Sequence, residues 1–173
     1  MKPNTVVRVG ENNSPAGQYM PYVSVDTGLT SGTRLLTLDG EIPAEILSIG
    51  DKLITRDCGV SKVTHIQRTT RKVRTISFAA GSLGHTRPES DTLLAGDQMV
   101  LIRDWRSRAL FNCERALVPA RALVDDEFII DLGEQNQVLI QIFCDSPHII
   151  YAGGLELGTA DASRARGAAL DAA

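Results

Sequence analysis

Closely spaced turn signals are the feature that most constrains the fold of this chain. From residue 33 onward, short runs of strand-forming residues are separated by turn dipeptides such as Asp39-Gly40 and Gly50-Asp51. Within the runs, apolar and polar residues alternate as they do in half-buried strands. Helical turns are expected at residues 43–47 and at the end of the segment 117–124, and residues 159–173 are either a frayed helix or disordered. The sequence therefore predicts an all-β domain with only short helical turns.

The expected strands leave two segments as loops, residues 79–91 and the polar stretch around Trp105. Trp105 is flanked by arginines, which suits either a protein-contact anchor or packing over a sheet edge. The expected inward-facing residues are Val63, Ile66, Val73 and Ile76. The predicted strands are residues 5–9, 34–38, 52–56, 60–68, 73–78, 93–94, 99–102, 117–119, 128–131, 138–143 and 149–152.

The length of 173 residues fits one domain with tails. We expect a polar leader over residues 1–27 that is partly ordered at most, a domain over residues 28–158, and an Ala-rich tail over residues 159–173. No window approaches the roughly 18 apolar residues of a membrane span, and the first residues do not resemble a signal peptide. The sequence thus predicts a cytoplasmic protein without membrane insertion.

Charge and composition make several classes of partner unlikely. Lys and Arg total 18 against 21 Asp and Glu, a net charge of −3, whereas nucleic-acid binders usually carry a basic face. The basic cluster at residues 68–74 is interpreted as a solvated strand or hairpin tip, with RNA binding as the alternative. No close ligand spacing joins the three cysteines (58, 113, 144) to the three histidines (65, 85, 148), so no disulfide, metal or other cofactor is predicted. No small-molecule substrate is evident.

Four segments, in order, resemble the Hint domain shared by inteins and the autoprocessing part of hedgehog proteins, and most of all its bacterial Hint_2 branch. They are GLTSGTR at residues 28–34, DGEIPAEILSIGDKLITRD at residues 39–57, LVPARAL at residues 117–123 and DSPHIIYA at residues 145–152. The resemblance covers residues 28–158. It implies a compact, disc-like all-β fold with halves related by a pseudo-two-fold axis.

The same resemblance implies acyl-transfer chemistry with two elements that this chain lacks. The family's first position is a Cys that attacks the preceding carbonyl, and it aligns with Gly28, which has no side chain. The family's Thr/Ser-x-x-His element aligns with Ala95 and Gln98. A carboxamide cannot shuttle a proton near neutral pH. The resemblance therefore implies a degenerate domain, and we expect a catalytically inactive structural or interaction module with a protein partner not identified by the sequence.

Self-cleavage near residues 27–31 by a displaced hydroxyl remains the alternative function. Two retained residues of the closing motif, Asp145 and His148, are interpreted as a hydrogen-bonded structural pair, with acid–base catalysis as the alternative. Asp97 is either a turn residue or a lone base. The candidate displaced nucleophiles are Ser24, Thr27, Thr30 and Ser31.

Overall fold

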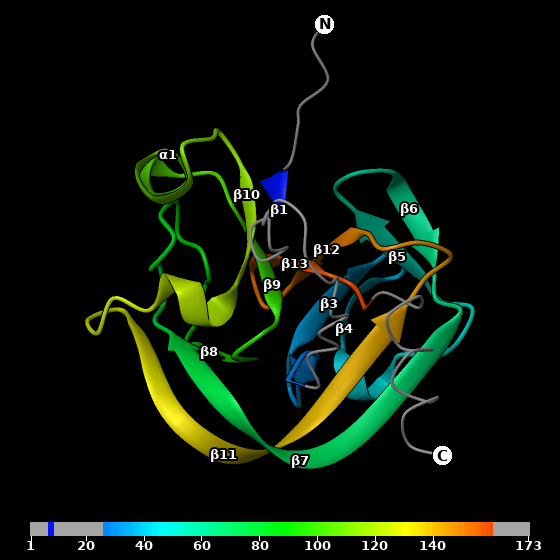
Figure 1. The fold of residues 1–173 in the computed structure, drawn as a ribbon. Coiled ribbons are helices and arrows are strands. Elements are labelled where there is room, and N and C mark those ends of the chain that lie inside the picture. Colours follow the sequence, from blue (N-terminus) through cyan, green and yellow to red (C-terminus); the bar gives the residue numbers. More distant parts are fainter. Residues whose placement is uncertain (1–6, 9–25, 161–173) are drawn as a thin grey trace, which may run out of the picture.

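Two strands much longer than the rest organise the fold. In the computed structural model, which describes residues 7–8 and 26–160, β7 (His65–Phe78) and β11 (Ile129–Phe143) pair antiparallel along almost their whole length. Figure 1 shows them curving and crossing beneath the other strands. Two short strands, β2 (Leu29–Thr30) and β8 (Thr92–Ala95), complete a closed sheet in the order β11–β2–β8–β7.

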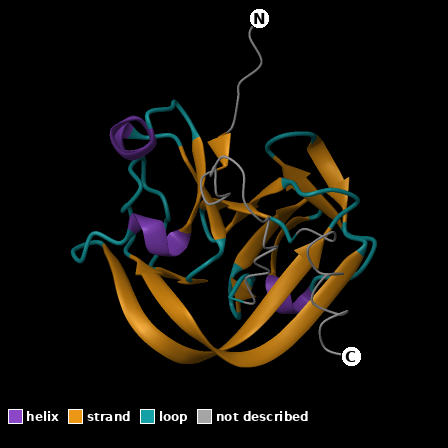
Figure 2. Ribbon diagram, viewed as in Figure 1, coloured by secondary structure: helices purple, strands orange, loops and turns teal. Residues whose placement is uncertain are grey.

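A second, larger sheet lies within the curve of this pair, and Figure 2 shows how much of the chain the strands account for. Its order is β1–β10–β9–β13–β12–β3–β5–β6, with β4 attached to β3. The strands are β1 (Val7–Arg8), β3 (Arg34–Thr37), β4 (Gly40–Pro43), β5 (Lys52–Thr55), β6 (Gly59–Lys62), β9 (Met99–Ile102), β10 (Ala116–Pro119), β12 (Ile149–Ala152) and β13 (Leu155–Gly158).

Prolines begin the two helical turns that the sequence predicts. Turn η1 (Ala44–Ile46) follows Pro43 and turn η2 (Ala120–Leu123) follows Pro119. Each proline has a φ near −65°, which suits the position just before a helical turn. The all-β prediction with short helical turns is therefore confirmed.

The prediction of a loop around Trp105 is wrong, because α1 (Trp105–Phe111) forms there. The Asp104 carboxylate caps its first turn by accepting the backbone N–H of Arg106 at 3.0 Å. Asn112 ends the helix in the left-handed conformation, with φ of 52°. A helix of seven residues is too short to show the periodicity of apolar residues that identifies helices. The capping residues Asp104 and Asn112 were the only signals of this helix in the sequence.

The predicted strand breaks within β7 and β11 are also wrong. Residues 68–74 continue β7 without a turn, and residues 132–137 continue β11. Charged side chains of the two strands face each other: Lys72 lies 3.7 Å from Glu134, and Arg74 lies 3.4 Å from Asp131. Such cross-strand pairs let a polar run remain in a sheet.

The core lies between the two sheets and includes Leu35, Leu53, Phe78 and Leu94, none of which is exposed. Of the expected inward residues, Val63, Val73 and Ile76 are buried, and Ile66 packs half-buried against the core. No helix within the described part of the chain is long and apolar enough to span a membrane.

Only part of the predicted tails can be compared with the structure. Val7 and Arg8 form β1, which pairs in parallel with β10, and Ala160 bridges to Phe143. The remainder of the expected leader strand, Ser24 and residues 161–173 lie outside the described residues.

Candidate functional site

Gly28, at the position where the family nucleophile is expected, is tied to Gln98. The backbone N–H of Gly28 donates to Gln98 Oε1 at 3.0 Å. The other end of the same carboxamide, Nε2, donates to the carbonyls of Gly158 at 2.8 Å and Met99 at 3.2 Å. Gln98 is only 4% exposed. One buried side chain therefore joins the entry to β2, the start of β9 and the end of β13.

A second carboxamide holds the other side of the same peptide bond. Gln141, on β11, donates from Nε2 to both the carbonyl oxygen and Oγ1 of Thr27, each at 3.0 Å. The Thr27–Gly28 peptide is thus bound at its N–H by an acceptor and at its C=O by a donor. Gln141 had no signal in the sequence, because its role depends on β11 lying against β2.

The structure leaves little room for a side chain at residue 28. Gly28 has a φ of +130°, which only glycine adopts without strain. A Cβ built there would meet Gln141 Cγ at 3.2 Å, and both the carbonyl oxygen of Ile140 and Leu139 Cβ at 3.3 Å. A cysteine could be accommodated only if this backbone or its neighbours moved.

The segment aligned with the Thr/Ser-x-x-His element lies beside Gly28. Leu29 pairs with Leu94, so the fully buried Ala95 is next in register to Gly28. Asp97 points its carboxylate to Arg121, with Nε at 2.5 Å, which suits the predicted turn position. Gln98 occupies the position that the resemblance gives to histidine.

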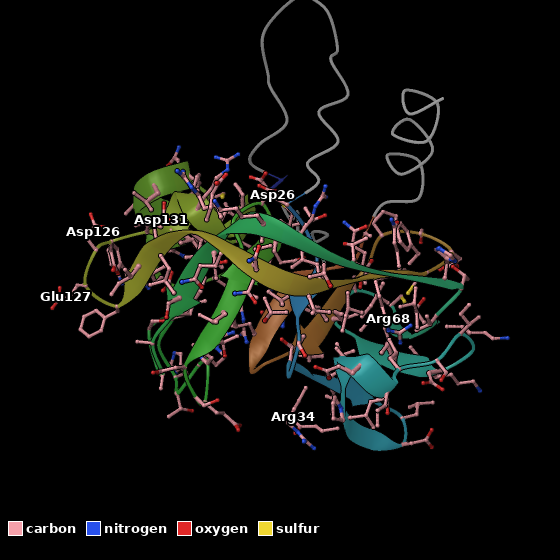
Figure 3. All side chains as sticks on the ribbon, turned by 90° about the horizontal axis from the view of Figure 1, so that it is seen from below. Asp26, Arg34, Arg68, Asp126, Glu127 and Asp131 are labelled. Atoms are coloured by element: carbon pink, nitrogen blue, oxygen red, sulfur yellow. The ribbon has the colours of Figure 1, made fainter. Side chains whose placement is uncertain are left out.

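Asp26 lies at the edge of this site, next to β7 (Figure 3). Its backbone carbonyl accepts the N–H of Asp97 at 3.0 Å. Partial burial, followed by the nearby negative charge of Asp97, raises the pKa of the Asp26 carboxyl.

Two of the candidate displaced nucleophiles are bound elsewhere. Thr30 is 5% exposed and donates from Oγ1 to the carbonyl of Leu93 at 2.8 Å. Ser31 Oγ donates to the carboxylate of Glu45, and this hydrogen bond is the main cause of the lowered pKa of Glu45. Thr27 is the candidate that lies at the Gly28 peptide itself.

A second polar cluster gathers around His148, which precedes β12. His148 Nδ1 lies 2.9 Å from Asp57 Oδ2, and Nε2 lies 3.2 Å from Asp145 Oδ1 and 3.9 Å from Cys58 Sγ. Burial acts to lower the pKa of His148, but hydrogen bonds to Asp57 and Asp145 outweigh it and the pKa is raised. The hydrogen bond from His148 in turn lowers the pKa of Asp145.

The expected contact between Asp145 and His148 is therefore present, whereas Asp57 and Cys58 were missed as members of the same cluster. Asp57 and Cys58 are separated from His148 by about ninety positions of sequence. Only the placement of the β5–β6 turn beside β12 brings them together. All three cysteines are free in the structure.

The basic cluster at residues 68–74 is largely compensated within the chain. Arg68 donates to the carbonyls of Glu45 and Leu47, at 3.2 and 2.9 Å, and Lys72 and Arg74 face the acidic residues of β11. Figure 3 shows Arg68 and Asp131 toward opposite ends of the β7–β11 pair. This arrangement gives no support to RNA binding.

Comparison with solved structures shows the fold. A DnaB intein from Synechocystis has a TM-score of 0.52 at 9% identity, covering 77% of this chain and 98% of the intein. A variant of the gp41-1 intein has a TM-score of 0.50 at 12% identity, covering 76% and 98%. An intein-like domain from Clostridium thermocellum has a TM-score of 0.49 at 14% identity, covering 78% and 99%.

Comparison with protein families gives a match along most of the chain, whereas a search of curated proteins found no match. The family model described as the Hint domain, Hint_2, matches residues 27–161. This range includes Gly28, Gln98 and His148. The chain belongs to the Hint domain family, in its Hint_2 branch.

Proposed function

We propose that this chain is a Hint domain without self-cleaving activity that serves as a structural or protein-interaction module. The observation that carries the proposal is the double restraint on the Thr27–Gly28 peptide. Gln98 accepts its N–H, Gln141 donates to its C=O, and the residue at the attacking position is a glycine. None of these three residues supplies a nucleophile for the Thr27–Gly28 peptide, which supports the proposal.

The chemistry of peptide cleavage supports this proposal. The leaving nitrogen of Gly28 must gain a proton, but Gln98 Oε1 is an acceptor and has no proton to give. Gln141 Nε2 is placed to stabilise negative charge on the Thr27 oxygen, as an oxyanion donor would. Stabilisation of an oxyanion has no effect on the rate unless a nucleophile attacks, and Gly28 supplies none.

One arrangement favours the alternative, in which Thr27 attacks the carbonyl of Asp26. That carbonyl oxygen accepts the N–H of Asp97 at 3.0 Å, and Thr27 is the residue that directly follows it. An N-to-O acyl shift would transfer the Asp26 acyl group from the nitrogen of Thr27 to its Oγ1. The hydrogen bond from Gln141 Nε2 holds Thr27 Oγ1 in place, yet Gln141 cannot remove the proton of that hydroxyl.

An interaction role is supported by exposed apolar residues on α1. Trp105 is 68% exposed and Leu110 is 58% exposed. The Arg106 guanidinium lies 5.1 Å from the centre of the Trp105 ring, a cation–π contact that orders the indole at the surface. Ordered, exposed Trp next to Arg is the composition of many protein-binding hot spots.

Intact mass spectrometry of the purified full-length chain tests the proposal. We expect the full mass to persist during incubation with a thiol or with hydroxylamine, which would cleave a thioester or an ester. A fragment of residues 28–173 would overturn the proposal. A fragment of residues 27–173, absent in Thr27→Ala, would establish the Thr27 alternative instead.

A further inference from the structure

The cluster around His148 contains the side chains of a transition-metal site. One ligand atom from each of Asp57, Cys58 and His148 lies within 4.8 Å of the other two. We propose that this cluster binds a divalent ion of the zinc class, with Cys58 and His148 as ligands and Asp57 as the residue that orients the histidine; Asp145, 3.2 Å from His148 Nε2, would rotate onto the ion as the third ligand. The site is separate from the Gly28 peptide, and the proposal does not depend on the loss of self-cleavage.

The hydrogen bonds of His148 determine which ring nitrogen can face a metal. Both ring nitrogens face a carboxylate, with Nδ1 2.9 Å from Asp57 Oδ2 and Nε2 3.2 Å from Asp145 Oδ1, so a metal that displaces the Nε2 proton would leave Nδ1–H to donate to Asp57. The other oxygen of Asp57 accepts the backbone N–H of Ile149 at 3.1 Å, which fixes the direction of the carboxylate. A carboxylate–histidine pair of this kind leaves the lone pair of Nε2 for a metal and increases its basicity.

Two candidate ligand atoms lie near the distances from Nε2 that a tetrahedral metal site requires. Bond lengths of about 2.0 Å to nitrogen and about 2.3 Å to sulfur place these two ligand atoms about 3.6 Å apart. Cys58 Sγ lies 3.9 Å from Nε2, and Asp145 Oδ1 lies 3.2 Å from it. Small rotations of these side chains would suffice, because Cys58 is exposed and the Asp145 side chain is 79% exposed.

The chemistry of the ligands selects the class of metal. A thiolate and an imidazole together favour zinc and similar borderline-soft ions, whereas magnesium and calcium prefer oxygen ligands alone. Thr55 Oγ1 lies 3.1 Å from Cys58 Sγ and can donate to the thiolate that a metal requires. Three protein ligands at the surface leave a fourth position for water.

Cobalt and zinc titrations of the purified full chain, first treated with a chelator, test this proposal. We expect one equivalent of Co²⁺ to produce the absorption band of thiolate coordination and one equivalent of Zn²⁺ to abolish it. Cys58→Ser should remove the band and weaken zinc binding at least tenfold, and His148→Gln should also weaken it. Asp57→Asn should keep the band and lower the affinity between about 10- and 100-fold.

Cys113→Ser is the matched control. Cys113 Sγ contacts the backbone carbonyl of Ser107 and takes no part in the cluster around His148. This variant should bind zinc and cobalt as the unaltered chain does. Circular dichroism and urea unfolding of the metal-free variants establish that each one is folded. Absence of the thiolate band in the unaltered chain, or a folded Cys58→Ser variant that keeps both band and affinity, would overturn the assignment.

Discussion

The backbone N–H of Gly28 donates a buried hydrogen bond of 3.0 Å to Oε1 of Gln98, a residue 70 positions further along the chain. Because Nε2 of the same side chain donates to Gly158 and Met99, Gln98 connects both ends of the domain to its centre. A residue at the expected position of a catalytic histidine thus has a structural role. Its side chain is therefore a sensitive point for stability.

Replacing Gln98 by alanine is expected to lower the free energy of unfolding by about 3 kcal/mol. The change removes the partner of the buried Gly28 N–H and the donor to the Gly158 carbonyl, and each unpaired buried group costs about 1–3 kcal/mol. Urea unfolding followed by circular dichroism measures the loss. The control is Gln135→Ala on the exposed surface of β11, which should change stability by less than about 0.5 kcal/mol. Equal losses in the two variants would contradict this role for Gln98.

Substitution of Gly28 by alanine is expected to destabilise the protein more than substitution of Gly32. Both glycines have positive φ, +130° and +86°, so an added Cβ is strained at either position. Only at Gly28 would the Cβ also meet neighbours at 3.2–3.3 Å, whereas nothing lies within 4 Å of the Cβ position at Gly32. Backbone strain costs about 1–3 kcal/mol, and crowding in a packed region adds about 1–3 kcal/mol. The difference between the unfolding free energies of Gly28→Ala and Gly32→Ala measures the cost of crowding at residue 28. A larger loss of stability in Gly32→Ala would contradict this prediction.

Glu156 is a buried carboxylate surrounded by three arginines. It is 3% exposed and lies 2.8 Å from Arg56, 3.2 Å from Arg103 and 3.5 Å from Arg87. Glu156→Gln leaves these guanidinium groups without their shared counter-charge, and we expect a loss of about 3 kcal/mol in the free energy of unfolding.

The matched control for Glu156 is Glu134→Gln. The side chain of Glu134 is 66% exposed and faces Lys72 at 3.7 Å, so its loss should cost less than about 1 kcal/mol. Thermal and urea unfolding of the two variants under the same conditions compare the buried and exposed carboxylates. Similar stability of both variants would show that the arginine cluster does not depend on Glu156.

Asp125 should make stability fall at acidic pH. Burial acts to raise the pKa of Asp125, but backbone N–H donors at Ile129, Glu127 and Phe128 and the charge of Arg106 together lower it from its usual value. These donors belong to the turn at the edge of Figure 3. Since the folded pKa is below the unfolded one, the stabilisation is fully present above about pH 4 and is lost as the pH falls through the folded value.

Urea midpoints of the unaltered chain and of Asp125→Asn, measured between about pH 6 and pH 2.5, test this effect. Asn keeps the side-chain oxygen as an acceptor but carries no charge. The difference in stability between the two proteins should be constant near neutral pH and shrink as the carboxyl becomes protonated. A difference that does not change with pH would contradict the lowered pKa.

The sequence predicted the strand class and the local turns because these depend on neighbouring residues. Pro43 begins a helical turn, and Asp51 accepts the N–H of Ser48 at 2.8 Å in the turn at Gly50-Asp51. The alternating apolar residues identified Val63, Val73 and Ile76 as buried positions. The motif order along the chain also identified the family, because motifs are read from the sequence itself.

Tertiary structure decided where distant segments meet. The charges of residues 68–74 suit either a solvated strand or a hairpin tip, and the structure places them within β7, where β11 supplies opposite charges. Gln141 reaches Thr27 across 114 positions, and Cys58 reaches His148 across 90. The chemistry of these side chains is fixed by residue type, but their partners are fixed by the packing of strands far apart in sequence, which no local pattern contains.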